Sequence, residues 1–191
     1  MPINVLFDFL APIYDHVFRE RLPEELMEVL ALPAKGFMLD AGGGTGRVSS
    51  QLRKHVDNLV IADLSRPMLR KASDKHDCCF VQTSATSFPF PDNFFSRIMV
   101  IDALHHFPDQ PGVVKELVRI LKPGGRLLIE EPDIHLFPVK LIALAEKLAL
   151  MGSHMHTYQM IQQMINRTGI SSSVKMDGRG SVWVIADKPI S

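Results

Sequence analysis

Leu39-Asp40-Ala41-Gly42-Gly43-Gly44-Thr45-Gly46 is the stretch that decides the fold of this 191-residue chain. A short apolar run, 37–39, leads into it and predicts a buried strand that enters a tight loop. Glycine adopts backbone angles that other residues resist, and it lets a ligand approach the main chain closely. A bare turn needs only about one or two glycines. The cluster therefore predicts a ligand-binding loop.

Strands and helices alternate on both sides of this loop. Buried strands are predicted at 37–39, 59–62, 78–82, 97–101 and 126–130. Helices are predicted at 46–56, 65–76, 113–121, 139–151 and 157–167, with a turn at 122–125. Two β-rich runs, 171–176 and 182–186, predict a terminal hairpin. The pattern indicates an α/β fold with a doubly wound, mostly parallel seven-stranded sheet and a C-terminal antiparallel hairpin. Such a sheet binds ligands beyond the carboxyl ends of its strands.

The composition predicts one domain, 1–191, and narrows the range of partners. Lys and Arg number 21, as do Asp and Glu, so no net basic field favours nucleic acid. No uncharged apolar stretch is long enough for a membrane span. The first ten residues include Asp8 and lack the basic region of a secretory signal. Cys78 and Cys79 are adjacent and rarely bridge as neighbours, which favours a reducing cytoplasmic location.

Two apolar helical segments complete the expected domain. The segment 1–35 is predicted as an N-terminal lid, and the segment 136–168 as a helical insertion on the substrate side. Because both are apolar, they favour a small, partly hydrophobic substrate. The protein is expected to be a monomer or a homodimer.

A nicotinamide or flavin dinucleotide site would need the spacing G-x-G-x-x-G. With Gly42 and Gly44 as the first pair, the third glycine position falls at Arg47. Starting at Gly43 puts Thr45 at the second position, so neither frame fits. Asp40 directly precedes the loop. An anion at this position contributes little to the binding of a pyrophosphate, which is itself negatively charged. A ligand with an ammonium and a sulfonium group tolerates it well, and S-adenosylmethionine is such a ligand.

Asp63 follows the second predicted strand, 17 residues after Gly46. A carboxylate at this point can accept hydrogen bonds from both hydroxyls of a ribose. Dinucleotide enzymes share this feature. The alternative is a solvated loop acid, or a charge at the start of the next helix, where Ser65 is the predicted N-cap.

With these residues in place, the chain resembles the class I, Rossmann-like methyltransferases that use S-adenosylmethionine, in particular the ubiquinone/menaquinone C-methyltransferases. Coverage runs from about residue 7 to the final hairpin. The matching stretches, in family order, are Leu39 to Gly46, Ala62 to Leu69, Phe88 to Phe95, Leu104 to Phe107 and Leu121 to Gly125.

The resemblance implies S-adenosylmethionine as cofactor and S-adenosylhomocysteine as product. It also implies these cofactor-binding residues: Asp40, Ala41, Gly42, Gly44, Asp63, Leu64, Ser84, Ala85, Ile101 and Asp102. Asp40 would orient the methionine ammonium, Asp63 would hold the ribose and Leu64 would pack on adenine. Ser84 stands where the family often has Asp. A hydroxyl accepts a hydrogen bond from the adenine amino group without charge assistance, so cofactor binding is expected to be weaker.

Methyl transfer from a sulfonium is an in-line displacement, so proximity and alignment dominate and some acceptors also need a general base. The candidates are Tyr14, His105, His106, Glu130 and Glu131. Each has a plainer alternative: the histidines could pack beneath their loop, the glutamates could be a solvated strand end, and Tyr14 could be core. No metal is expected, because His135, His154 and His156 match no zinc spacing and both cysteines fall on a strand predicted to be buried.

The main hypothesis is therefore transfer of a methyl group from S-adenosylmethionine to a small molecule, without nucleic acid or membrane partners. A second hypothesis is a non-catalytic protein that binds S-adenosylmethionine or S-adenosylhomocysteine as a sensor or assembly partner. A third is a nicotinamide oxidoreductase, which the glycine spacing argues against.

Overall fold

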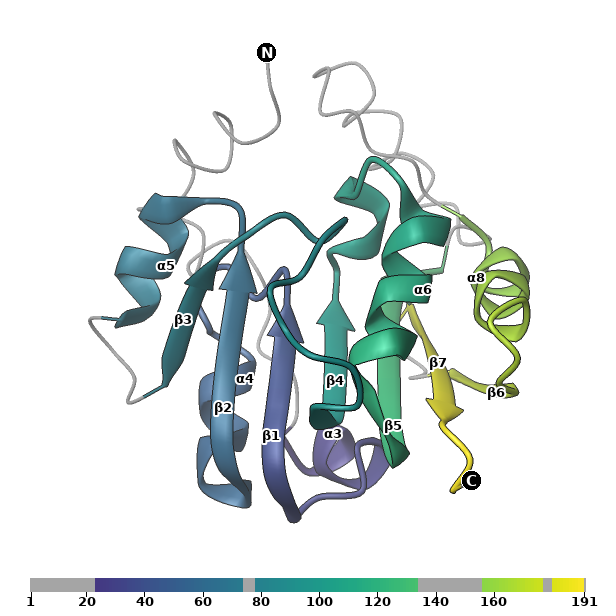
Figure 1. Ribbon diagram of the computed structural model, residues 1–191, viewed down its shortest axis with the longest axis horizontal. Coiled ribbons are helices and arrows are strands. Elements are labelled where there is room, and N and C mark those ends of the chain that lie inside the picture. The colour runs from purple at the N-terminus through teal and green to yellow at the C-terminus, as the bar shows by residue number, and fades with distance from the viewer. Residues whose placement is uncertain (1–22, 74–77, 134–155, 177–179, 191) are drawn as a thin grey trace.

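The computed structural model describes residues 23–73, 78–133, 156–176 and 180–190 (Figure 1). Tyr14, most of the predicted lid and the first part of the predicted insertion lie outside these residues, as do His135 and His154. None of the described helices is long and apolar enough to cross a bilayer.

A seven-stranded sheet with the order β3-β2-β1-β4-β5-β7-β6 forms the centre of the molecule (Figure 1). Its strands are β1 (Ala34–Ala41), β2 (Val56–Asp63), β3 (Cys79–Gln82), β4 (Phe95–Ile101), β5 (Leu121–Pro132), β6 (Ser172–Met176) and β7 (Ser181–Asp187). The first five pair in parallel, whereas β7 runs antiparallel between β5 and β6. The predicted doubly wound sheet and its terminal hairpin are confirmed.

The helices cover both faces of the sheet because alternate strand residues point to opposite sides. They are α3 (Pro23–Val29), α4 (Ser49–Leu52), α5 (Arg66–Ser73), α6 (Gln110–Ile120) and α8 (Tyr158–Asn166), with 3-10 turns η1 (Arg53–His55) and η2 (Leu104–His106). Leu39 of β1 joins a core with α6 and α8. Its neighbour Met38 joins the opposite core with α3, α4 and α5. The predicted N-cap is confirmed, because the Met68 N–H donates to the Ser65 hydroxyl at 3.3 Å.

Three local predictions are wrong, each because sheet geometry decides the outcome. The predicted helix 46–56 is cut short, since Val56 already pairs with Ala34 as the first residue of β2. The predicted turn 122–125 lies inside β5 as an irregularity, where Gly124 has φ +74° and donates to the Lys188 carbonyl. The cysteine strand is not buried, because β3 is at the sheet edge and Cys79 is exposed.

The sheet order creates the switch point at which ligands bind. From β1 the chain proceeds outward through β2 and β3, then returns to β4 on the other side of β1. The carboxyl ends of β1 and β4 therefore send their loops in opposite directions and leave a crevice between them. These loops begin at Gly42 and Asp102, so the glycine stretch stands at the switch point.

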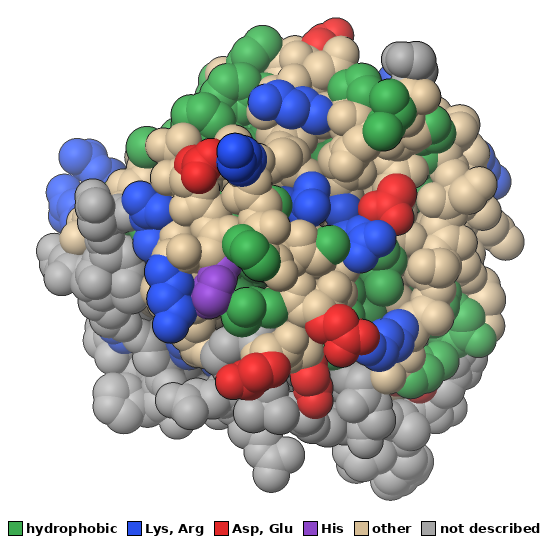
Figure 2. Space-filling model, turned by 90° about the horizontal axis from the view of Figure 1, so that it is seen from below, with side chains coloured by type: hydrophobic (Ala, Val, Ile, Leu, Met, Phe, Trp, Pro, Cys, Tyr) green, Lys and Arg blue, Asp and Glu red, His purple; other side chains and the backbone are tan. Residues whose placement is uncertain are grey.

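The opposite face of the molecule, at the amino ends of the parallel strands, mixes charges of both signs. Figure 2 shows basic side chains interspersed there with acidic and apolar ones, without a continuous basic field. Arg126 and Asp187 at this end form a two-bond ion pair at 2.7 and 2.8 Å.

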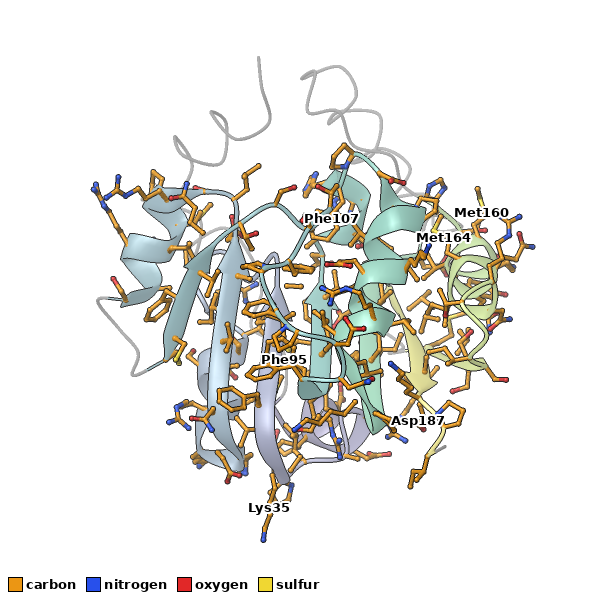
Figure 3. The ribbon with its side chains drawn as sticks, viewed as in Figure 1. Lys35, Phe95, Phe107, Met160, Met164 and Asp187 are labelled. Carbon is orange, nitrogen blue, oxygen red and sulfur yellow. The ribbon has the colours of Figure 1, made fainter. Side chains whose placement is uncertain are left out.

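An aromatic cluster packs at the amino end of β4. Phe95 is fully buried and meets Phe90 and Phe94 edge to face, both at a ring-centroid distance of 4.9 Å (Figure 3). Edge-to-face contacts add to the hydrophobic stabilisation of burial. This cluster fixes the entry of β4, the strand on which the second loop of the crevice depends.

Phe95→Ala is expected to lower the free energy of unfolding by about 3–5 kcal/mol, because a large buried ring is replaced by a cavity. Urea denaturation measures the change. Ile190→Ala is the control, since Ile190 is 86% exposed and its loss is expected to cost under about 0.5 kcal/mol. Equal effects of the two substitutions would contradict this account of the core.

Candidate cofactor site

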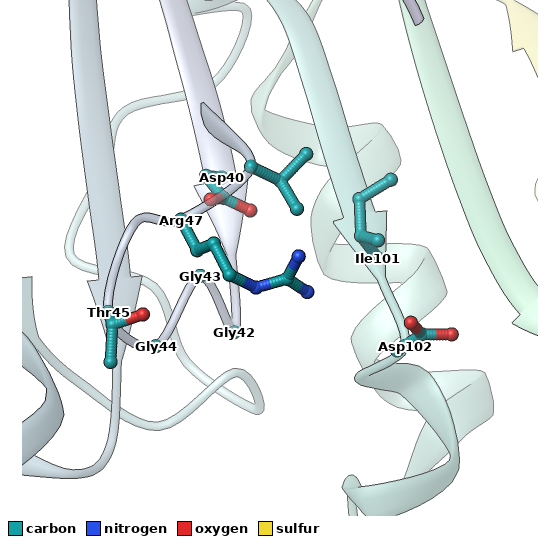
Figure 4. A pocket seen from close by; sticks show the side chains of 9 residues that line it. Asp40, Gly42, Gly43, Gly44, Thr45, Arg47, Ile101 and Asp102 are labelled. Atoms are coloured by element: carbon teal, nitrogen blue, oxygen red, sulfur yellow. The ribbon is translucent and has the colours of Figure 1, made fainter. Parts of the chain in front are cut away.

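A pocket opens at the switch point between the glycine loop and the end of β4 (Figure 4). The empty space within it is about 410 Å³, which includes open solvent at its mouth. Its lining residues are Asp40, Gly42, Gly43, Gly44, Thr45, Arg47, Val48, Ile101 and Asp102. The structure thus brings together five residues predicted for the cofactor, namely Asp40, Gly42, Gly44, Ile101 and Asp102.

Of the remaining lining residues, Gly43 and Thr45 belong to the predicted ligand-binding loop, whereas Arg47 and Val48 were not predicted. Thr45 and Val48 are buried beside the loop, and Arg47 reaches the pocket from its end. Arg47 entered the sequence argument only as the residue that breaks the dinucleotide spacing. A cation next to a ligand loop was the signal that could have identified it.

The glycines of the loop serve different purposes. Gly42 has φ +75°, and an added Cβ would lie 2.8 Å from Ala103 Cβ. At Gly43 an added Cβ would lie 2.5 Å from Asp40 Oδ2. Both positions are required for close packing of the loop. Gly44 has φ +54° and nothing within 4 Å of its Cβ position, so it borders open space in which a ligand can approach the main chain.

Asp40 lies beneath the loop with only 3% of its surface exposed. Burial raises the pKa of this carboxyl to about 7, and the negative charge of Asp63 adds to the increase. The nearby Ser49 hydroxyl acts in the opposite direction. Asp40 therefore changes charge near neutral pH, directly below the pocket.

Asp63 ties the end of β2 to two loops. Its Oδ2 accepts the Gly44 N–H at 2.9 Å, and its Oδ1 accepts the Ser65 N–H at 2.8 Å. The alternative predicted for Asp63, a charge at the start of the following helix, is thus realised. A carboxylate offers about four acceptor positions, more than these two bonds use.

The expected adenine side of the site lies next to Asp63. The Thr83 N–H donates to the Asp63 carbonyl at 3.0 Å, which brings the segment after β3 against the end of β2. In that segment the Ser84 hydroxyl bonds to the Thr86 hydroxyl at 2.9 Å, and Ala85 is half-buried. The Leu64 side chain is 47% exposed beside the same segment.

Glu131 anchors the turn that follows β4. One of its oxygens accepts the Leu104 N–H at 2.7 Å, and the other pairs with His105 Nδ1. His105 and Glu131 are each 5% exposed, and Glu130 is fully buried. The reading of both glutamates as a solvated strand end is therefore wrong. Glu131 holds the 3-10 turn in place, and His105 packs beneath the loop.

His106 is the more exposed member of the histidine pair. Its ring centroid lies 3.9 Å from that of His105. Burial, and secondarily the charge of His105, lower its pKa to about 3. His106 is therefore an uncharged imidazole at neutral pH. Among the described residues, no three His, Cys, Asp or Glu side chains cluster as metal ligands would.

Comparison with known proteins agrees with this geometry. Residues 39–129 match the family model described as a methyltransferase domain. The ubiquinone/menaquinone biosynthesis C-methyltransferase UbiE of Vibrio cholerae is 35% identical over 104 residues, covering 49% of this chain and 40% of UbiE. The methyltransferase GfsG of Streptomyces halstedii is 35% identical over 120 residues, covering 59% of this chain and 43% of GfsG. The matched part is thus under half the length of these relatives.

A solved structure extends the likeness to the whole fold. The structure of the (4+2)-cyclase SpnF has a TM-score of 0.79 at 16% identity and covers 99% of this chain and 96% of SpnF. At this identity the likeness concerns the fold alone. The fold and the family match together define a class I methyltransferase domain. This is the class that the sequence motifs resemble. Residues 39–129 of this chain match that family, and the family implies S-adenosylmethionine as cofactor.

Gly43→Ala is expected to lower the free energy of unfolding by about 1–3 kcal/mol, because the new methyl group would press on Asp40 Oδ2 at 2.5 Å. Urea denaturation of Gly43→Ala, Asp40→Ala and the double variant forms the test. The double variant removes the clashing carboxylate, so its loss is expected to be smaller than the sum of the two single losses. Strictly additive losses would show that the Asp40 contact does not govern this position.

Asp40 is expected to make stability depend on pH. Between its ordinary pKa of 3.8 and about 7, the folded state keeps a proton that the unfolded state has lost. The free energy of unfolding therefore falls as pH rises through this window, by at most about 1.4 kcal/mol per pH unit, and levels off above it. Denaturation of wild type and Asp40→Asn from pH 4 to 8 measures the difference. A constant gap between the two proteins would refute the raised pKa.

Proposed function

We propose that the protein transfers a methyl group from S-adenosylmethionine to a small, partly apolar molecule. The observation that carries the proposal is the glycine loop at the switch point, flanked by carboxylates on two strand ends, within the region that matches the methyltransferase family. When bound, the cofactor supplies a methyl group on a positively charged sulfur, which needs no further activation. The protein then has to bind the cofactor and the acceptor, align them with each other and exclude water.

The residues at the site fit the parts of this cofactor. Asp40 and Asp102 are acids on the pocket wall and suit an ammonium group. Asp63, at the end of β2, suits a ribose through the acceptor capacity of its carboxylate. The exposed side chain of Leu64 suits the flat apolar face of adenine. Ser84 and Ala85 would border the edge of that ring.

Apolar groups near the pocket support an acceptor with an apolar part. Ile101 lines the pocket, and the Phe107 ring lies beside the loop, 3.1 Å from the Cβ position of Gly42. His106 is uncharged at neutral pH and has a low proton affinity, so it suits hydrogen bonding to the acceptor better than removal of its proton. The acceptor would then attack with its own electron pair, aligned by the site.

A protein that binds the cofactor without turnover is the second candidate. It is favoured by Ser84, which lacks the charge of the usual acid, and by the weak basicity of His106. This candidate predicts cofactor binding without methyl transfer to any acceptor.

A cytoplasmic location is supported by the unbridged thiols of Cys78 and Cys79.

Calorimetric titration with S-adenosylmethionine, S-adenosylhomocysteine and NADH tests the cofactor assignment. We expect both sulfur nucleosides to bind and NADH not to bind. Asp63→Asn is expected to weaken S-adenosylhomocysteine binding by about 10- to 100-fold, because a charge-assisted acceptor is lost. Asp57→Asn, the same change at the opposite end of β2, is the matched control and is expected to bind like wild type.

Turnover separates the two candidates. Release of S-adenosylhomocysteine is followed in a panel of small phenols, amines and quinone-like compounds. Product formed with one acceptor, and formed more slowly by Asp63→Asn at low cofactor concentration, supports the transferase. Tight cofactor binding with no product from any acceptor favours the non-catalytic candidate, and binding of NADH alone would overturn both.

A further inference from the structure

The connection between β3 and β4, residues 83–94, is held against α6 by one ion pair. In Figure 1 this connection runs alongside α6. Glu116 and Arg119 lie one turn apart on α6, and the Nε and Nη2 atoms of the arginine each donate to a carboxylate oxygen at 2.7 Å. Because a guanidinium bound at two points is fixed in its plane and its direction, the pair forms a rigid unit on the helix.

Both members of this pair also bond to the connection. Arg119 Nη2 donates to the Phe90 carbonyl at 2.9 Å, and its Nη1 pairs with Asp92. Glu116 Oε1 accepts the Phe88 N–H at 3.1 Å. The hydrogen bond from Arg119 lowers the pKa of Glu116, so the acceptor of this N–H is a charged carboxylate. Charge-assisted hydrogen bonds are roughly twice as strong as neutral ones, so the backbone at Phe88 is firmly anchored.

A short turn, 83–87, precedes this anchor and is tied at its other end to β2. The Thr83 N–H donates to the Asp63 carbonyl at 3.0 Å. At the far end, the Phe88 N–H donates to Glu116, and the Phe88 side chain is buried in the core. The turn is therefore fixed from outside both at the end of β2 and by a carboxylate of α6.

Ser84 in this turn is the residue expected at the adenine edge. The Ser87 N–H donates to the Ser84 carbonyl at 3.3 Å and closes the turn. The Ser84 hydroxyl bonds to the Thr86 hydroxyl at 2.9 Å and accepts the Thr86 N–H at 3.4 Å. A hydroxyl has one donor and two acceptor positions, so one acceptor position is left when Ser84 donates to Thr86. Hydrogen bonds weaken steeply with poor alignment, so a neutral acceptor depends on accurate placement.

We propose that Glu116 is a positioning residue for cofactor binding. Held by Arg119, its carboxylate fixes the 83–87 turn so that the Ser84 hydroxyl can accept a hydrogen bond from the 6-amino group of adenine. This inference rests on the proposed function. Accurate placement by the ion pair on α6 offsets part of what is lost because Ser84 carries no charge.

A pair of ligands tests the proposal by calorimetry. They are S-adenosylhomocysteine and its analogue in which hydrogen replaces the 6-amino group of adenine. Wild type is expected to bind S-adenosylhomocysteine about 3- to 10-fold more tightly than the analogue, the range of one neutral hydrogen bond. Ser84→Ala and Glu116→Ala are each expected to bring the ratio of the two Kd values close to one. The first removes the acceptor, and the second releases the turn that places it.

Glu28→Ala is the matched control, because it also removes a glutamate from an ion pair. The partner of Glu28 is Lys175 at 3.2 Å, and the pair lies on α3 and β6 rather than at the turn. This variant is expected to keep the wild-type ratio. Glu116→Gln keeps an oxygen that can accept the Phe88 N–H without charge, so its ratio is expected to lie between those of wild type and Glu116→Ala. Thermal melting of each variant verifies folding, and Glu116→Gln decides the question if Glu116→Ala does not fold.

Each outcome has a separate meaning. An unchanged ratio in Glu116→Ala, including equal weakening of both ligands, would show that the pair only stabilises the fold and would overturn the proposal. A wild-type ratio close to one would also overturn it, because Ser84 would then not accept the amino group, while the cofactor assignment would stand. Failure of wild type to bind either nucleoside would overturn the proposed function and this inference with it.

Discussion

Strand β1 is paired along both of its edges, and the arrangement of the other strands and of the pocket depends on this pairing. It pairs in parallel with β2 through Leu39 and Asp40, and the same residues pair with β4 on the other side. Because neighbouring strands cover both edges of β1, the chain that follows it leaves the sheet beyond its carboxyl end. Because β2 and β4 end at the same edge, the loops that follow all three strands meet there. The pocket is a consequence of this pairing.

The pairing also explains how much of the fold could be predicted. Continuous apolar runs such as 59–62 and 97–101 are typical of strands that are buried on both faces, and their order along the chain defines a doubly wound sheet. The limits of the elements depend on partners distant in sequence. Val56 becomes a strand residue because Ala34 lies opposite it, although its local pattern is helical. Cys79 is exposed because β3 is the edge strand of the sheet in the described part of the chain.

The site was predictable where a residue type carries its own chemistry. The glycine loop and Asp40 line the pocket as expected, and Asp63 lies next to it through Gly44. Residues whose role depends on burial were not predictable. Glu131 has the sequence context of a solvated acid, yet it is enclosed by the turn that it supports through Leu104 and His105. For Arg47 the sequence offers only its position directly after the glycine loop, and the direction of its side chain in the structure places it at the pocket.

The two ends of the sheet have a consequence for the protein in concentrated solution. An edge strand presents unpaired backbone groups onto which another chain can add. Here β3 has only four residues, and β6 has five. Lys175 lies on β6 over the Trp183 ring at 5.7 Å, which places a charge along that edge. Short edge strands and lysines on them are features by which natural sheets resist edge-to-edge aggregation. The edges of this sheet therefore offer no long strand onto which another chain could add.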